Sequence, residues 1–207
     1  MARRRKIPPS ITVPPLWRRR PLLGLALVLL AGLVVYERGF GHLGQEDDYT
    51  RYHDGVFEVV KVVDGDTLDI GISDGSYRAT RIRLWGVDTP EVAGSRDGAM
   101  HYGAEASALA KRRLLGRQVR VILSPTKTRG KYGRLLAYVY LQPSGAMFNE
   151  LLLEHGYAYA DWRFAHPYKR QFKTIEARAR KRGVGLWQAV TLDRMPQWRQ
   201  RMESLDD

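Results

Sequence analysis

Alternating apolar and polar residues recur through the middle of the chain and predict short β-strands. The runs with this pattern are residues 56–70, 77–87, 118–125 and 133–141. The first run is rich in β-branched residues but is interrupted by Asp64-Gly65-Asp66, which predicts two strands joined by a tight turn. In the second run, Ile82 and Leu84 fall on one face of the predicted strand and the neighbouring arginines fall on the other.

Three later segments space their apolar residues three or four positions apart and predict helices. They are residues 101–115, 148–155 and 171–182, and each is followed by a glycine, a residue that commonly ends helices. This order of elements predicts an α+β domain over residues 55–190, in which the five strands close as an OB-type five-stranded β-barrel with about three helices. Residues 191–207 show no clear pattern and are expected to form a tail.

The first 54 residues differ in composition from the rest. Residues 1–20 are basic and contain no acid, whereas residues 21–36 carry no charge. As a helix, this uncharged run of 16 residues is about 24 Å long. That length is at the short end for spanning a bilayer core of about 30 Å. The polar, glycine-bearing residues 37–54 are expected to be a linker.

Residues 21–36 have three possible interpretations: a cleaved signal peptide, a buried core helix or an uncleaved signal anchor. No small-residue cleavage site follows the run, and the run is apolar all round. These features favour a single transmembrane signal anchor. The arginines that precede it predict a cytoplasmic N-terminus and a C-terminal part outside the cytoplasm. Secretion after signal cleavage is the alternative.

Charge narrows the class of partner. The chain has a formal net charge of +12 and no cysteine. An excess of this size favours polyanions, which means nucleic acid or an anionic membrane surface. The lack of cysteine rules out disulfides and thiolate metal sites. The five histidines show no metal-ligand spacing and are interpreted as surface or packing residues.

Carboxylates and arginines gather near the ends of the predicted strands. They are Asp64, Asp66, Arg83, Asp88, Glu91 and Arg134. Carboxylate oxygens suit a hard cation, glutamate can act as a general base, and arginine forks match phosphate oxygens. These are the parts needed to cleave a phosphodiester. Each residue also has a structural explanation, as a turn, a helix cap or a solvated strand charge, so spacing alone leaves both interpretations open.

Several ordered motifs favour the catalytic interpretation. They are VVDGDT (62–67), RLWGVDTPE (83–91), YGAEAS (102–107), KYGR (131–134) and NELLLEHGYA (149–158). In this order, over about residues 55–190, the chain resembles the staphylococcal-nuclease-like (thermonuclease) family. The resemblance implies an OB-type barrel with three helices. It also implies an enzyme that cuts DNA and RNA with little sequence preference and leaves 3′-phosphate ends. The N-terminal anchor is not part of the family pattern.

The resemblance also implies a role for each candidate residue. Asp66 and Asp88 would be calcium ligands together with the Thr89 carbonyl, with Asp64 in or just behind that shell. Arg83 and Arg134 would grip the scissile phosphate. Glu91 would orient or deprotonate the attacking water. Lys131 and Tyr132 would touch outer phosphates or stack near the nucleotide.

Two functions from different classes follow. The first is a calcium-dependent nuclease tethered to a membrane through residues 21–36, with DNA and RNA as substrates and no obligate protein partner. The second is a catalytically inactive OB module that binds nucleic acid or protein. The complete set of acids and arginines favours the enzyme, because clustered carboxylates repel a polyanion unless a cation neutralises them. A third interpretation, an envelope component in which cutting is incidental, has less support.

Overall fold

The computed structural model describes residues 47–95, 98–125 and 127–206, and the chain from Asp47 onward forms one compact unit. The predicted basic N-terminus (1–20) and signal anchor (21–36) lie outside the described residues. Within the part that is described, no helix combines the length and the apolar character needed to cross a membrane. The signal anchor therefore stays a prediction.

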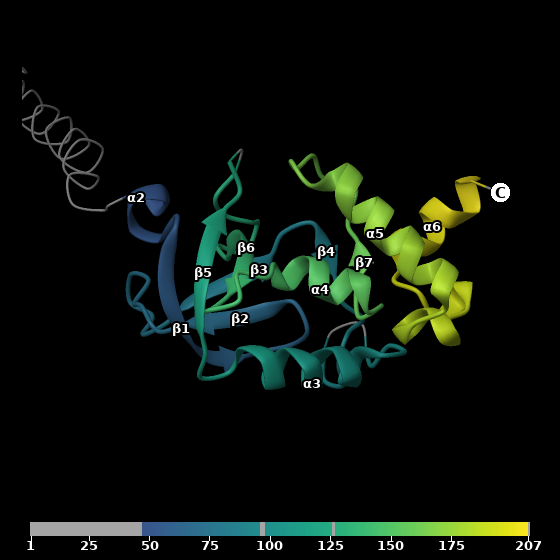
Figure 1. The fold of residues 1–207 in the computed structure, drawn as a ribbon, viewed down its shortest axis with the longest axis horizontal. Coiled ribbons are helices and arrows are strands. Elements are labelled where there is room, and N and C mark those ends of the chain that lie inside the picture. Colours follow the sequence, from purple (N-terminus) through teal and green to yellow (C-terminus); the bar gives the residue numbers. More distant parts are fainter. Residues whose placement is uncertain (1–46, 96–97, 126, 207) are drawn as a thin grey trace, which may run out of the picture. The chain divides into compact units, whose positions relative to one another are not determined.

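The unit contains a closed five-stranded barrel, whose strands lie toward one end of the unit in Figure 1. Its strands are β1 (Gly55–Val62), β2 (Thr67–Ile70), β3 (Thr80–Leu84), β5 (Gln118–Leu123) and β6 (Leu135–Leu141). Their order around the barrel is β1-β2-β3-β6-β5, and β1 pairs with β5 to close it. The pair β3–β6 is parallel, and the other pairs are antiparallel. The α+β class and the five-stranded barrel are confirmed.

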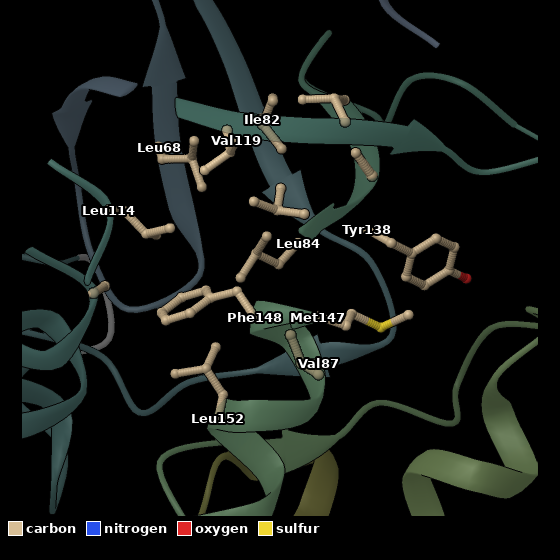
Figure 2. Packing of buried hydrophobic residues seen from close by; sticks show 14 of the residues in the cluster. Leu68, Ile82, Leu84, Val87, Leu114, Val119, Tyr138, Met147, Phe148 and Leu152 are labelled. Atoms are coloured by element: carbon tan, nitrogen blue, oxygen red, sulfur yellow. The ribbon is translucent and has the colours of Figure 1, made fainter. Parts of the chain in front are cut away.

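The predicted alternation on β3 is confirmed by burial. Thr80, Ile82 and Leu84 are buried, Arg81 is exposed, and Arg83 is partly exposed. Apolar side chains at every second position therefore face the barrel interior and leave the arginines on the outside. Figure 2 shows Leu84 close to Phe148 of helix α4 (Phe148–Glu154), with Leu68 and Ile82 farther into the same core cluster.

Four further helices and a two-stranded sheet complete the unit. The helices are α2 (Asp48–Tyr52), α3 (Gly103–Leu114), α5 (Lys169–Arg182) and α6 (Gln197–Asp206). The small sheet pairs β4 (Val87–Asp88) with β7 (Tyr159–Ala160). The predicted helices correspond to α3, α4 and α5. Helix α2 lies inside the segment expected to be a linker, and its Tyr52 is buried.

The C-terminal tail is ordered, although the sequence pattern predicted no element there. Two 3-10 turns, η2 (Gly185–Gln188) and η3 (Leu192–Arg194), lead into α6. This segment packs into a second apolar cluster. The buried members of the cluster are Tyr159, Ala179, Leu186, Trp187, Met195 and Trp198. This cluster joins α5 and β7 to the tail, so the tail packs against the folded unit.

Candidate active site

The turn between β1 and β2 carries the first two candidate acids. Asp64 is half-buried and accepts a 3.0 Å hydrogen bond from the Asp66 backbone N–H through Oδ1. Asp66 is 1 % exposed. A Cβ added at Gly65 would come within 2.7 Å of the Thr89 side chain, so glycine is required where the turn approaches the residues after β4.

Asp66 ties this turn to the RLWGVDTPE segment. Its Oδ2 accepts hydrogen bonds from the Thr89 backbone N–H at 2.7 Å and from Thr89 Oγ1 at 2.9 Å. Its Oδ1 accepts from Thr67 Oγ1 at 3.1 Å. A buried carboxylate must be paired or hydrogen-bonded to stay charged, and Asp66 meets this need with donors from two segments.

Arg83 joins the two acids that were predicted to bind calcium. From β3 its guanidinium forms ion pairs with Asp66 and with Asp88, and it also donates to the Val87 carbonyl at 3.3 Å. The three side chains are largely shielded from water, with exposures of 18 % for Arg83, 1 % for Asp66 and 16 % for Asp88. Arg83 therefore links the β1–β2 turn to the segment that follows β3 through two ion pairs.

Asp88 has two further partners that the sequence motifs did not indicate. Trp198 Nε1, from α6, donates to Asp88 Oδ2 at 2.7 Å. Arg163 lies 3.8 Å from the same oxygen and places its guanidinium 4.2 Å from the centre of the Trp198 ring. No local pattern in residues 191–207 marks Trp198, because its contact joins positions 110 apart in sequence.

Glu91 is positioned through its backbone. Its carbonyl accepts a 2.9 Å hydrogen bond from the Met100 N–H, and a Cβ added at Gly103 would come within 2.1 Å of that oxygen. The YGAEAS motif therefore starts α3 directly against Glu91. Burial raises the pKa of the Glu91 carboxyl, and the negative charges of Asp64 and Asp88 raise it further. Glu91 is thus close enough to Asp64 and Asp88 to be repelled by both.

Arg134 lies beside this group of acids. Burial lowers the pKa of the Arg134 guanidinium, the Arg83 charge lowers it further, and Asp64 opposes the shift. Burial raises the pKa of Asp64, against the charges of Arg83 and Arg134. Tyr132 is exposed, with its ring 5.7 Å from the Arg134 guanidinium and 5.8 Å from Lys131 Nζ. The predicted phosphate-binding residues therefore adjoin the predicted acids.

All the metal donors suggested by the resemblance are oxygen atoms, and this set suits a hard cation such as calcium. The mutual repulsion recorded in the raised pKa of Glu91 is also what a cation would offset. Within residues 47–95, 98–125 and 127–206, however, no group of three metal-binding side chains is already arranged around one point. Arg83 stands between Asp66 and Asp88. The donor atoms of these residues fit a hard cation in chemistry.

Sequence comparisons agree with the fold. The model of the family described as "Staphylococcal nuclease homologue" matches residues 81–189. The chain is 34 % identical over 167 residues to the thermonuclease of Staphylococcus hyicus, an alignment that covers 79 % of this chain and 95 % of the relative. It is 32 % identical over 170 residues to the thermonuclease of Staphylococcus intermedius, covering 81 % and 94 %.

A more partial relative is the SPbeta prophage-derived endonuclease YokF of Bacillus subtilis, 32 % identical over 133 residues, covering 61 % of this chain and 42 % of that protein. Barrel, site and comparisons together define an OB-like α+β domain of the nuclease class. The chain belongs to the staphylococcal nuclease family.

Proposed function

We propose that this protein is a calcium-dependent nuclease that hydrolyses phosphodiester bonds in DNA and RNA, without sequence preference, and leaves 3′-phosphate ends. One observation carries the proposal: the fold brings two arginines and four acids from four separate segments to one place beside the barrel. Family relatives named as thermonucleases and an endonuclease support it. A binding scaffold has no physical need for mutually repelling acids at a surface that meets a polyanion.

Glu91 is the proposed general base. A general base works best when its pKa lies near the operating pH, and the raised pKa of Glu91 moves it in that direction. In this role Glu91 would orient a water molecule and take its proton as the water oxygen bonds to phosphorus. The bond between phosphorus and the 5′ oxygen would break, and the 5′ oxygen would leave as a hydroxyl after taking a proton from solvent. The backbone contacts of Glu91 with Met100 and Gly103 hold it in place for that step.

Arg83 and Arg134 are the proposed phosphate-binding groups. The planar guanidinium can donate two parallel hydrogen bonds to phosphate oxygens and stabilise negative charge as it builds in the transition state. Arg134 would reach the phosphate from the position just before β6. Lys131 and Tyr132, which lie next to Arg134, would contact outer phosphates or the adjoining nucleotide.

Asp66, Asp88, the Thr89 carbonyl and Asp64 are the proposed calcium-binding residues. A bound divalent cation would polarise a phosphoryl oxygen and stabilise charge at that oxygen. Asp66 and Asp88 would then no longer depend on Arg83 for their neutralising charge. The guanidinium of Arg83 would be available to the substrate.

We also propose that residues 21–36 tether the enzyme to a membrane, with residues 1–20 in the cytoplasm and the nuclease domain outside it. The basic residues ahead of the uncharged run support this topology. Protease added to intact spheroplasts that express the full chain tests it. Digestion of the domain is expected, whereas protection until the membrane is broken would place the domain in the cytoplasm. A shortened protein in the medium would indicate the cleaved signal peptide instead.

The nuclease proposal is tested with the full chain, purified in a mild detergent, on end-labelled DNA and RNA. Cleavage is expected with calcium and is expected to stop with excess chelator. Glu91→Gln should lower the rate by on the order of 100-fold, within the range for loss of a general base. Glu58→Gln is the matched control, because Glu58 is an exposed glutamate on β1. Full activity in chelator would remove calcium from the proposal. Binding of nucleic acid without cleavage under any condition would support the inactive OB module.

A further inference from the structure

A cleft of about 960 Å³ opens beside the candidate active site, and the C-terminal tail forms one of its walls. Asp88, Thr89 and Glu91 line the catalytic side. The tail wall consists of residues 193–198, 200 and 201, and Arg163 lines the cleft next to it. The family match ends at residue 189, so the tail residues of this wall lie beyond the matched part of the chain, whereas Arg163 lies within it.

A buried ion pair fixes the wall to the domain. Arg199 is 2 % exposed and forms two hydrogen bonds of 3.1 Å with the Glu176 carboxylate of α5. It also donates to Glu203 at 2.7 Å, and its guanidinium lies 4.0 Å from the centre of the Trp162 ring. A buried arginine with this many partners holds α6 in one position, so the cleft is part of the folded structure.

The wall reaches the catalytic acids directly. Trp198 is 9 % exposed and donates to Asp88 at 2.7 Å. Arg163 stacks on the outer face of that indole and is itself held by Asp161, at 2.8 and 2.7 Å. The Trp198 indole and the Arg163 guanidinium therefore contact Asp88 and also line the cleft.

The side of the cleft built by the tail is basic. Arg163, Arg194 and Arg201 line it, against one acid of that segment, Asp193. Arg194 and Arg201 are exposed, and no ion pair engages either of them within the described part of the chain. Arg163 adds a third guanidinium group, which is partly exposed. Together the three arginines make a positively charged surface that attracts phosphates.

We propose that residues 191–206 and Arg163 form a second phosphate-binding wall, which holds the backbone of a single-stranded polynucleotide on one side of the bond to be cut. Basic grooves with aromatic side chains are the common means of binding single strands without sequence preference. The inference rests on the proposed nuclease function, because it assumes that the strand passes the acids at the mouth of the cleft. It assigns a function to the tail.

The test measures binding separately from cleavage. A fluorescent oligo(dT) of about 12 nucleotides is titrated with the full chain in chelator, and anisotropy gives Kd at several salt concentrations. The variant Arg194→Gln/Arg201→Gln removes two exposed charges from the wall. The control Arg112→Gln/Arg113→Gln removes two exposed charges from the C-terminal end of α3, outside the cleft.

Each lost phosphate contact lowers the slope of log K against log salt by about 0.7 for a single strand. The wall variant should therefore lose about 1.4 from the slope and bind on the order of 10-fold more weakly at 0.1 M salt. The α3 variant should keep both values near those of the original chain. In cleavage assays with calcium, the wall variant should raise KM more than it lowers kcat.

The outcomes separate this inference from the nuclease proposal. Equal salt slopes and equal affinities for the two variants would overturn the proposal that the wall binds phosphates, even if the protein cleaves DNA. A loss confined to duplex DNA would also overturn it. A protein that never cleaves, but whose wall variant alone loses the salt-dependent binding, would refute the nuclease proposal and keep the wall as a nucleic-acid-binding surface. Circular dichroism of both variants checks that the fold is intact.

Discussion

The ion pair between Glu176 and Arg199 allows a sharp test of how the tail is held. Replacing Arg199 with Met keeps much of the apolar length of the side chain but removes the guanidinium. Glu176 would then be a buried carboxylate whose remaining hydrogen bond is the one of 2.8 Å from the Ala160 N–H. Glu203 is 20 % exposed and also pairs with Arg180 at 3.0 Å, so its loss of Arg199 should matter less.

The expected loss of stability is large. Removing one partner of a buried ion pair costs about 3–5 kcal/mol, because the other charge stays buried and uncompensated. For a folded unit of this size, 1 kcal/mol shifts Tm by about 2–4 °C. Arg199→Met should therefore lower Tm by roughly 6–20 °C. The double variant Glu176→Gln/Arg199→Met leaves no unpaired charge and should regain about 2 kcal/mol or more of that loss.

The loss should also depend on pH. Burial raises the pKa of Glu176, and the charge of Arg199 opposes that shift. Without Arg199 the folded-state pKa rises further above the unfolded value. A group with a raised folded-state pKa contributes stability that is present at low pH and is lost as pH rises through the folded pKa. The difference in stability between the original chain and Arg199→Met should therefore grow from about pH 5 to about pH 8.

Thermal and urea unfolding of the full chain, followed by tryptophan fluorescence at both pH values, measure these effects. Arg120→Met is the matched control, because Arg120 pairs with Asp54 at the surface, with exposures of 46 % and 55 %. Its effect should stay within about 1 kcal/mol. The reasoning would be refuted if Arg199→Met and Arg120→Met cost the same, or if the double variant were no more stable than Arg199→Met alone.

Three other predictions concern the site and the core. Trp198→Phe keeps an aromatic ring but removes the N–H group that donates to Asp88, so the cleavage rate should fall by about 10-fold, the scale of one hydrogen bond to a charged group. Unchanged kcat and KM would count against a role of Trp198 in positioning Asp88. Arg134→Lys and Arg83→Lys should each lower kcat by on the order of 100-fold, because an ammonium group cannot donate the two parallel hydrogen bonds that a guanidinium donates to phosphate. Near-normal rates in both variants would mean that these arginines are solvated surface charges. Burial lowers the pKa of His166 from 6.5, so the folded state should lose stability as pH falls below about 6.5. His166→Leu should reduce the fall in Tm between about pH 7 and pH 5. An unchanged dependence of Tm on pH would show that His166 is not the cause of that fall.

Local sequence patterns were sufficient for the barrel strands, three of the helices and the parts of the site. Alternation along β3 decides which side chains face inward, because successive residues of a strand point to opposite faces whatever the partner strand is. The motifs at 62–67, 83–91 and 131–134 contain the acids and arginines of the site, but only the resemblance to a known family implied that these side chains would lie close together. Strand faces and tight turns depend on neighbours in sequence, so the order of residues reveals them.

Only the tertiary structure decided how distant segments meet. The parallel pairing of β3 with β6 depends on closure of the whole barrel, and the two-residue strands β4 and β7 are too short to leave a periodic signal. Helix α6 is the clearest case. Its apolar residues are scattered, and Leu205 is exposed. Trp198 is buried, and Met202 partly buried, because residues of η2, α5 and β7 form an apolar cluster against which they pack. The contact of Trp198 with Asp88, and with it the second wall of the cleft, arises from packing between residues far apart in the chain, which no local pattern records.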